Sequence, residues 1–508
     1  MSIAVKLLFQ ALLGVAAVGC AVTSDYHLTP VEVPQRWSEQ QADNVSVAQS
    51  AIAWWTMFQD VELNSLIERA VKANFDARLA RVRLLEVRKQ LSVASANVAP
   101  SLNARASYER EKESKNAPAP LLIDRYGTIE TPGQPENLFQ AGLDASWELD
   151  IFGGQGRTIE AARSTVDVAA FERDGVILSL LAEVARTYFE LRTTQRVIAV
   201  ATENVSTRNE LAALVSARFA GGMAPYGDVA RAKLLARQAA AEIPPMHSRY
   251  KNAVNRLSTL LGLWPGALAS ELKAPTSSPL ESPAFSPGLP SDLLRQRPDI
   301  LRAERTIAVT SARLGVATAD LYPRFLLNGT ARLASVSASD FFSAGSLLWK
   351  IGPTLTWPIF RRGQIVASIK VRELQQQAAL LEYRKVILTA LEEADNAIDA
   401  YAQQKDRHVA LLAAWYESEA AVSMSVSRYK GGIADFREVL DARILHVHAQ
   451  TELLYSDGDV ALALVALYKA VGGGWNAVSS GAQADALDQP AHCGAMPTER
   501  KQPCSSSP

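Results

Sequence analysis

The sequence lacks most features that would assign a chain quickly to a functional class. No run of about 18 apolar residues follows the N-terminal region, which argues against a membrane-spanning helix; lipid-facing β-strands would leave the composition unchanged. The 508 residues carry a net charge of −1 without a basic patch, so we expect no nucleic-acid partner. Phosphate-binding loops, nucleophile elbows and metal-ligand clusters are also absent from the sequence. We therefore expect neither an enzyme nor a cofactor-dependent protein.

Cysteine is scarce, and the first of three cysteines ends a short export signal. Lys6 precedes an apolar run, and small residues lead into Cys20. The segment Leu13–Cys20 resembles a bacterial lipobox, in which the cysteine is diacylated and becomes the new N-terminus; ordinary cleavage before Cys20 is the alternative. We predict a signal peptide over residues 1–19 and a covalent lipid on Cys20. Because Ala21 rather than aspartate follows, we expect the outer membrane rather than the inner membrane.

The other two cysteines, Cys493 and Cys504, lie in a polar tail over 475–508. We expect this tail to be disordered and the pair to carry no function. A disulfide formed in an oxidising periplasm is the alternative.

Proline is absent from two very long stretches, 157–220 and 364–430, which together contain one glycine. A helix of either length spans on the order of 95–100 Å, which no compact domain accommodates. Both stretches place apolar residues at alternating spacings of four and three, which favours left-handed packing against other helices. The seam positions are Ile177, Leu181, Val184, Tyr188 and Leu191, followed 210 residues later by Ile387, Leu391, Ala394, Ile398 and Tyr401.

The shared spacing is part of a tandem duplication. Residues 218–222 (RFAGG) parallel 428–432 (RYKGG), again 210 positions later, and 150–155 parallel 358–364. Each copy orders a helix, a strand pair, a long helix, a Gly-Gly turn and a return helix. We expect Pro244-Pro245 to interrupt the first return helix.

Alternating segments predict a strand pair over 101–151 and another over 324–359, after helices that end before Pro100 and Pro323. Every second residue from Phe139 to Ile151 is apolar, and polar residues stand between them. One face of such strands suits lipid and the other suits water, as in a membrane barrel; a soluble hairpin with one buried face is the alternative. Four strands are too few to close a barrel around a channel. Closure requires several chains, and three chains supply twelve strands.

We divide the chain into six segments. They are the signal peptide (1–19), a lipidated N-terminal extension (20–60), the first repeat (61–264, with the first helix over 62–99), a proline-rich linker (265–291), the second repeat (292–474, with its first helix over 293–320) and the tail (475–508).

These features resemble the outer-membrane factor family, the TolC-like efflux channels, and especially its lipoprotein branch that serves resistance-nodulation-division pumps. The most specific match is the run 297–300 (Arg-Pro-Asp-Ile), followed by Ala303-Glu304, Gly315 and Tyr322-Pro323. Trp54-Trp55 with Phe58, Asp60, Leu63 and Leu66, then Asn74, matches the opening of the mature domain. The likeness covers about residues 50–475.

The resemblance implies a homotrimer with a twelve-stranded β-barrel in the outer membrane and a long α-helical coiled-coil tunnel in the periplasm. A periplasmic adaptor and an inner-membrane pump would load this duct, which would passively conduct small toxic compounds. Two alternatives are a protein-secretion duct of the same fold and a periplasmic coiled-coil scaffold or adaptor lipoprotein.

In this family the periplasmic helix tips close like an iris, with carboxylates at the constriction. The matching residues here, Glu438 and Asp441, are three positions apart and share a helical face, so three copies would form two negative rings. For Glu438 the alternative is a capping box with Asp435 as the N-cap. In the first copy Asp228 aligns with Glu438 and Arg231 with Asp441. We hypothesise that Arg231 pairs with a carboxylate of the second tip; a purely helix-starting Asp228 is the alternative.

Three further groups have a structural explanation. Pro298 and Asp299 suit a first helical turn, the acid lying beside the positive end of the helix dipole. The acidic run around Glu393 reads as a solvated or lumen-facing helix surface. His446 and His448 are two residues apart and point to different helix faces, which argues against a metal site.

Overall fold

The computed structural model describes residues 34, 37, 53–112, 114, 135–274, 291 and 295–478. The predicted signal peptide, Cys20, the prolines of 275–290 and the C-terminal cysteines lie outside the described residues. The chain forms two compact units, which we call the strand unit and the hairpin unit. The strand unit contains Asp76–Gly175 and Leu289–Asp395, and the hairpin unit contains Gln41–Phe75, Val176–Gly288 and Asn396–Pro508.

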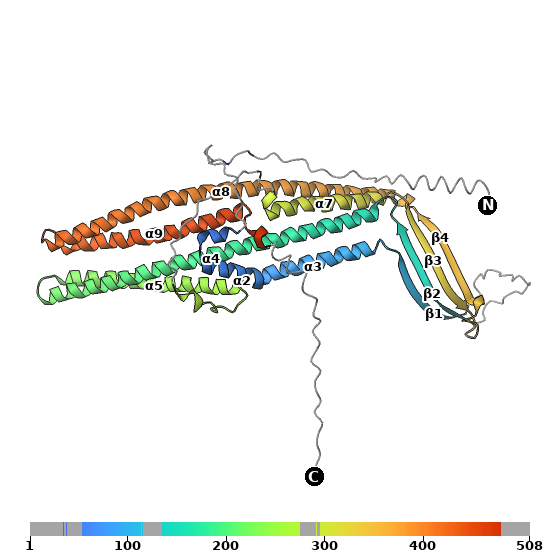
Figure 1. The fold of residues 1–508 in the computed structure, drawn as a ribbon, viewed down its shortest axis with the longest axis horizontal. Coiled ribbons are helices and arrows are strands. Elements are labelled where there is room, and N and C mark those ends of the chain that lie inside the picture. Colours follow the sequence, from blue (N-terminus) through green and yellow to red (C-terminus); the bar gives the residue numbers. More distant parts are fainter. Residues whose placement is uncertain are drawn as a thin grey trace, which may run out of the picture. The chain divides into compact units, whose positions relative to one another are not determined.

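Two long helices contribute many residues to both units. They are α4 (Gly154–Ala220) and α8 (Arg362–Lys430), of 67 and 69 residues, and both are unbroken (Figure 1). At about 1.5 Å per residue each is on the order of 100 Å long, as the absence of internal proline predicted. The predicted seam is buried along α4, where Leu181, Val184 and Tyr188 are at most 1% exposed. Ile387 and Ala394 are equally buried on α8.

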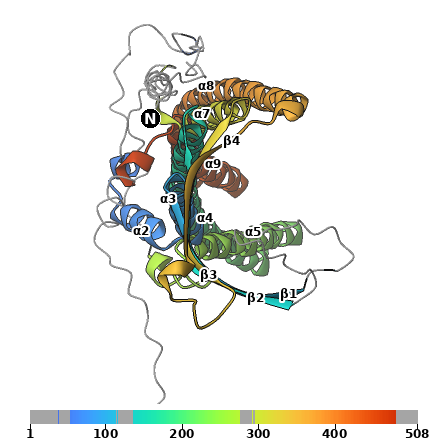
Figure 2. The same cartoon turned by 90° about the vertical axis from the view of Figure 1, so that its right-hand side faces the viewer.

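A single antiparallel sheet defines the strand unit. Its strands are β1 (Ser101–Lys112), β2 (Pro135–Leu149), β3 (Arg324–Ser335) and β4 (Leu347–Thr356), in the order β1-β2-β3-β4. Figure 2 shows the sheet curved across its width, with β1 and β4 at its two edges. The short helices η3 (Ala344–Ser346) and η4 (Ile359–Arg361) precede and follow β4.

The strand register places the alternating apolar residues of all four strands on one face. Ala106 pairs with Ala141 across β1 and β2, Leu143 pairs with Ala331 across β2 and β3, and Gly329 pairs with Ile351 across β3 and β4. Because side chains alternate along a strand, this register aligns the following residues: Leu102, Ala104, Ala106 and Tyr108 of β1; Phe139, Ala141, Leu143, Ala145 and Trp147 of β2; Phe325, Leu327, Ala331 and Leu333 of β3; and Leu347, Trp349, Ile351 and Leu355 of β4.

The two faces of the sheet differ in how their side chains are satisfied. On the polar face Ser146 Oγ donates to Asn328 Oδ1 at 2.9 Å, and Thr330 Oγ1 donates to Asp144 Oδ1 at 2.8 Å. On the apolar face Trp349 is 72% exposed and Ile351 is 68% exposed. An apolar face this open disfavours the soluble hairpin, whose apolar side chains would be buried.

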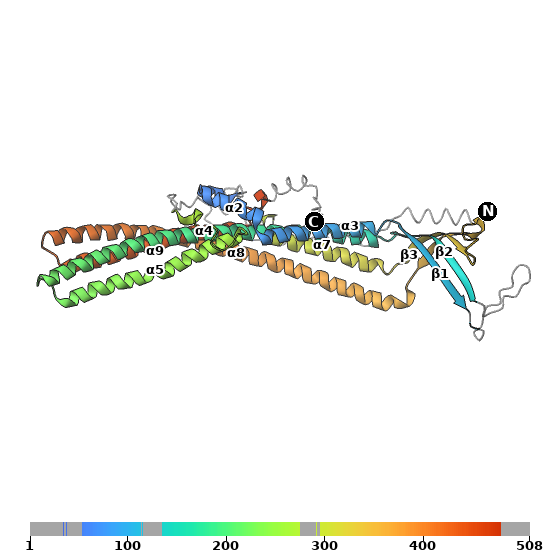
Figure 3. The ribbon, with the colours of Figure 1, turned by 90° about the horizontal axis from the view of Figure 1, so that it is seen from below.

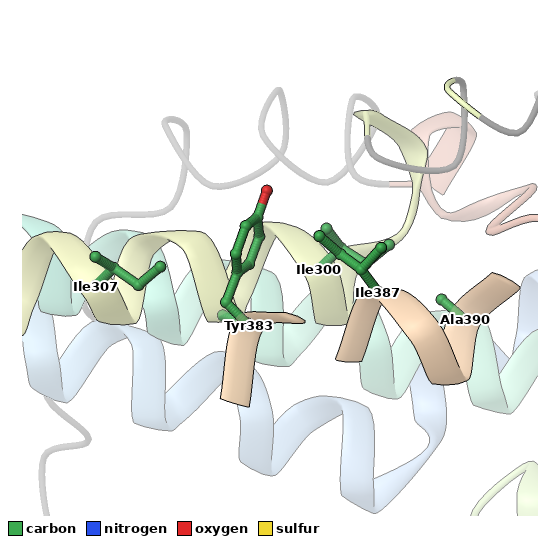
Figure 4. Packing of buried hydrophobic residues seen from close by; sticks show 6 residues of the cluster. Ile300, Ile307, Tyr383, Ile387 and Ala390 are labelled. Carbon is green, nitrogen blue, oxygen red and sulfur yellow. The ribbon is translucent and has the colours of Figure 1, made fainter. Parts of the chain in front are cut away.

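Helices α3 (Phe75–Ala96) and α7 (Pro298–Ala319) accompany the sheet in the strand unit. Figure 4 shows how α7 packs on α8: Ile300 and Ile307 meet Tyr383, Ile387 and Ala390. The expected helix start is confirmed, since Pro298 is in the first turn and the Asp299 carboxylate accepts a hydrogen bond from the backbone N–H of Ile300 at 3.0 Å.

Two helical hairpins form most of the hairpin unit (Figure 3). In one, the second part of α4 turns into α5 (Tyr226–Leu260); in the other, the second part of α8 turns into α9 (Phe436–Ala470). Three short elements complete the unit: η1 (Trp54–Phe58), α2 (Val61–Ala73) and η2 (Glu271–Lys273).

The residues just before α2 belong to the core of the hairpin unit. Trp54 stacks on Tyr468 at a ring-centre distance of 5.2 Å, and Phe58 contacts Phe189 at 4.7 Å. The Tyr188 hydroxyl donates to the Asp60 carboxylate at 2.6 Å. Burial raises the pKa of Tyr468 to about 12. Trp54–Phe58 therefore belong to the folded chain, although the predicted boundary at residue 60 assigned them to the N-terminal extension.

Trp475 shows that the folded chain also extends past the boundary predicted near its C-terminal end. This residue is 9% exposed, and residues 475–478 form a helical turn. The folded part therefore passes the predicted tail boundary at 475.

Two expectations about helices were wrong. The predicted helix over 62–99 is broken into α2 and α3 at Asn74, which is buried and donates through Nδ2 to the Leu260 carbonyl at 2.9 Å. Conversely, Pro244 and Pro245 do not interrupt α5. Both prolines are exposed, so water can bind the carbonyls that lose their helical N–H partners.

Candidate functional site

The candidate site lies at the ends of the two helical hairpins, and the duplicated glycine motifs build it. Gly222 and Gly432 adopt left-handed φ angles of 73° and 72°, as residues that follow a helix end commonly do. The same backbone bonds close both turns: Met223 N–H donates to the Arg218 carbonyl at 2.8 Å, and Ile433 N–H donates to the Arg428 carbonyl at 3.0 Å. The two turns therefore lead into α5 and α9 with the same backbone geometry.

Glu438 is in the first turn of α9 and is held by the other arm of its own hairpin. Arg428, near the end of α8, places Nη1 2.8 Å from Glu438 Oε1. Asp435 is the N-cap residue, as expected, but its side chain accepts no capping hydrogen bond. The capping-box alternative is therefore wrong for Glu438, because its carboxylate turns to Arg428 rather than to the backbone of Asp435.

Asp441 lies one turn further along the same face of α9. Its nearest cation is Arg437, whose Nε is 3.9 Å from Oδ2, and the two side chains are 71% and 66% exposed. An exposed pair at this distance contributes little to stability. The negative charge of Asp441 is thus largely available to the surroundings, whereas that of Glu438 is partly offset.

The first-copy residues Asp228 and Arg231 are exposed and make no ion pair within the described chain. Asp228 is in the first turn of α5, where an acid is stabilised by the helix dipole. Val229 and Ala232 of the same turns are buried against Ala212 and Val215 of α4, so Asp228 and Arg231 lie away from the hairpin core. A bond from Arg231 to the second tip does not form within one chain, and a bond to a neighbouring copy stays a prediction.

One contact between the two hairpins was missed by reasoning from the sequence. Arg218 Nη1 donates to the Tyr429 hydroxyl at 3.3 Å, which joins the end of α4 to the end of α8. Both residues belong to the duplicated motifs, and the exchange of Phe219 for Tyr429 between the copies is the only signal that could have pointed to it.

A second polar cluster joins α4, α8 and α9 further from the tips. Arg196 Nη1 lies 3.1 Å from Asp457 Oδ2, and His408 Nδ1 lies 3.4 Å from Asp457 Oδ1. Burial raises the pKa of the Asp457 carboxyl, although the charges of Arg196 and His408 oppose this effect. The cluster couples both repeats through one carboxylate.

The acidic run around Glu393 on α8, which was expected to be a solvated or lumen-facing surface, contains a partner of Arg297. The buried guanidinium of Arg297 reaches Asp299 and, through Nη2, Glu393 at 2.7 Å. Burial alone would lower the pKa of Arg297, but its bonds to these two acids outweigh burial and raise it. Glu393 is thus an ion-pair partner that ties α7 to α8, not a purely solvated residue.

The described residues show no arrangement typical of a metal site. Among them no group of three or more His, Cys, Asp or Glu side chains is arranged to hold a metal ion. His446 instead bonds through Nδ1 to Ser418 Oγ at 3.0 Å and stacks on Trp415. No helix within the described ranges is long and apolar enough to cross a membrane.

Comparison with solved structures shows the class of protein. The structure of the outer-membrane channel OprN matches with a TM-score of 0.81 and 30% identity, over 90% of this chain and all of that one. The fold is therefore that of an outer-membrane channel, and the chain is not an enzyme.

The sequence of the chain shows its family. The model of the outer membrane efflux protein family matches residues 66–263 and 289–473, and the chain belongs to this family. The family places the chain in the bacterial outer membrane. The pyoverdine export protein OpmQ of Pseudomonas aeruginosa is 31% identical, over 88% of this chain and 92% of its own. The cation efflux protein CusC of Escherichia coli is 28% identical, over 91% and 97%.

Proposed function

We propose that the chain is the outer-membrane duct of a tripartite efflux pump and passively conducts small compounds to the exterior. The observation that supports this most directly is the four-stranded sheet, whose one apolar face is exposed while its two edge strands have no partner within the described chain. An apolar face suits lipid, and unpaired strand edges in lipid are too costly to persist. Three chains would satisfy both requirements in a twelve-stranded barrel.

The two long helical hairpins would then form the periplasmic tunnel of the trimer. A periplasmic adaptor and an inner-membrane pump would engage this part and supply the energy, because the chain belongs to the outer membrane efflux protein family. Glu438, Asp441, Asp228 and Arg231 would line the periplasmic aperture, where exposed carboxylates attract cations.

The relatives favour small solutes over protein secretion. OpmQ is a pyoverdine export protein, and CusC is a protein of a cation efflux system. Family membership speaks against a soluble scaffold or adaptor. We propose toxic organic compounds or ions as the cargo class and a lipid on Cys20 as the additional anchor.

Reconstitution tests the proposal. Protein extracted from outer membranes should migrate as a heat-sensitive trimer and should open stepwise conductances in planar lipid bilayers. Deletion of its gene should increase sensitivity to several small toxic compounds, and the wild-type gene should restore resistance. A soluble monomer without conductance would contradict the proposed duct.

A further inference from the structure

The two strand hairpins, β1–β2 and β3–β4, have the same register, so each residue of the first hairpin has an equivalent residue in the second. Leu102 of β1 pairs with Ala145 of β2, and Phe325 of β3 pairs with Leu355 of β4. β1 therefore maps onto β3 by 223 positions and β2 maps onto β4 by 210.

Two tryptophans follow the same rule. Trp147 Nε1 donates to the Val98 carbonyl at 3.0 Å, and Trp357 Nε1 donates to the Leu321 carbonyl at 3.1 Å. Trp357 is 210 positions after Trp147, and Leu321 is 223 positions after Val98. The hairpin geometry is thus duplicated down to individual hydrogen bonds.

The pairing of β2 with β3, which we call the β2–β3 seam, joins the two copies of the repeat within one chain. Among the described residues no strand pairs with the other edge of β4 in the same way. In the β2–β3 seam Ala145 pairs with Gly329 and Trp147 pairs with Leu327. When the β2 residues are moved to β4 and the β3 residues are moved back to β1 by these shifts, Leu355 lies opposite Ala106 and Trp357 lies opposite Ala104. The strand expected to pair with the other edge of β4 is therefore a β1. Because β1 of the same chain lies at the opposite edge of the sheet, this β1 would belong to another copy.

A duplicated glycine supports a strand beside β4. A Cβ on Gly142 would lie 2.2 Å from Cβ of Arg332, so the strand across the β2–β3 seam requires glycine there. Gly352 is the equivalent residue on β4, yet a Cβ on it would meet nothing within 4 Å. The mapped seam puts Glu109 of another copy at this position and gives Gly352 the same close neighbour.

The aromatic residue after each hairpin supports the same seam. Phe152 stacks on Tyr322 at 4.8 Å and lies 6.5 Å from Phe325. The Ile-Phe motif that follows each hairpin relates Phe152 to Phe360 by 208 positions, because the segment after Trp357 is two residues shorter than the segment after Trp147. Phe360 is fully exposed, and Leu102, the counterpart of Phe325, is 67% exposed. Two uncovered apolar side chains at opposite edges of one sheet would cover each other across two copies.

We propose that β4 of one chain pairs antiparallel with β1 of a second copy in the register that opposes Leu355 and Ala106, and that Phe360 packs on Leu102 of that copy. This register also opposes Lys350 and Glu111 on the polar face, where unlike charges in cross-strand positions attract. The proposal rests on the trimer of the proposed function and specifies its strand contacts.

Disulfide trapping tests the register. In a Cys493→Ser/Cys504→Ser background, Leu355→Cys with Ala106→Cys should form inter-chain disulfides that give covalent dimers and trimers on denaturing gels. Leu355→Cys with Ala104→Cys is the control displaced by two residues. Directly opposed Cβ atoms are about 4.5–5.5 Å apart and diagonal ones about 7–8 Å, so oxidation of the first pair should be on the order of tenfold faster.

The possible outcomes separate the register from the function. Faster linkage to Ala104→Cys, or to Tyr108→Cys, would overturn the register. Conducting trimers that link through none of the three pairs would overturn the β4–β1 contact and leave the duct in place. A chain that stays monomeric would overturn both, because no neighbouring copy would exist.

Two substitutions test the packing without cysteine chemistry. Gly352→Val should leave the helix content of the chain unchanged, because the residue has open space in its own fold, and should abolish the detergent-resistant trimer. Phe360→Ala should lower the temperature at which the trimer dissociates. Phe342→Ala should not, although the Phe342 side chain is likewise exposed, at 85%. Equal dissociation temperatures for the two alanine variants would overturn the Phe360–Leu102 contact.

Discussion

Charge at the hairpin tips is distributed unequally, although the two tips share one backbone geometry. Glu438 is paired with Arg428 at 2.8 Å, while Asp441 is 66% exposed beside a distant Arg437. The first-copy tip offers Asp228 and Arg231, both exposed. If three copies surround an axis, Asp441 is the residue with the most unbalanced negative charge, and we expect it to contribute most to ion selection.

Asp441→Ala should weaken cation preference, because it removes a ring of negative charge at the constriction. It should also raise single-channel conductance in planar bilayers by a factor of about two to three, because the carboxylates would hold the closed tip through pairs to neighbouring copies. Glu438→Ala should have a smaller effect, because Arg428 already offsets part of its charge. Glu419→Ala, at an exposed position on α8, serves as the control. Unchanged conductance and ion preference in the Glu438→Ala/Asp441→Ala double variant would refute the aperture assignment.

At the scale of elements, α4 and α9 approach each other unusually closely beside the Arg196–Asp457 pair. A Cβ on Gly458 would lie 2.3 Å from Thr193 Oγ1 and 3.0 Å from its Cγ2. The neighbouring residues Arg196 and Asp457 bridge the same two helices at 3.1 Å. The small residue permits the contact, and the ion pair depends on the helices staying this close.

Gly458→Ala should therefore destabilise the helical hairpins by about 1–3 kcal/mol, the usual cost of overpacking. Thermal unfolding followed by far-ultraviolet circular dichroism measures the change. Adding Thr193→Ala should recover part of the loss, because only its Cβ, 3.1 Å away, would remain near the new methyl group. Gly227→Ala, at an open helical position, is the matched control. If Thr193→Ala brings no recovery, the close approach is not the cause.

For the whole molecule, the lipid on Cys20 and the barrel would be two independent attachments to the outer membrane. Several acyl chains on one residue hold a protein firmly at a bilayer, and strands closed by neighbouring copies anchor it separately. The two contributions can be separated because the proposed strand contacts involve no residue near Cys20.

Cys20→Ser should abolish incorporation of labelled palmitate, since the thiol is the proposed site of acylation. The trimer should persist, because the sheet residues are unchanged; blue native electrophoresis of membrane extracts measures this. Cys493→Ser/Cys504→Ser should retain the label. Palmitate that still attaches to the Cys20→Ser variant would rule out this residue as the lipid site.

Features with a short-range cause could be predicted from the sequence. The alternation from Phe139 to Ile151 predicted the strand and its apolar face, and the missing prolines predicted α4 and α8. The Gly222 and Gly432 turns follow from motifs that differ by one fixed shift. Periodicity and backbone restriction act over a few residues, so the order of amino acids alone reveals them.

Other features depend on residues that are distant in sequence. The break at Asn74 is stabilised by the Leu260 carbonyl, and Arg297 pairs with Glu393, 96 residues away. Neither partner can be chosen from local pattern, because many polar residues compete for each bond. The uninterrupted α5 is similar, since the effect of Pro244 depends on whether water reaches the freed carbonyls.

The sequence by itself determined the duplication, the long helices and the two faces of the strands, because each arises from spacing along the chain. Only the tertiary structure decided how the copies differ. It placed Glu438 beside Arg428, joined Arg218 to Tyr429, and left Phe360 uncovered where Phe152 is stacked. These contacts join side chains brought together by folding, and the uncovered ones indicate where another copy of the chain is needed.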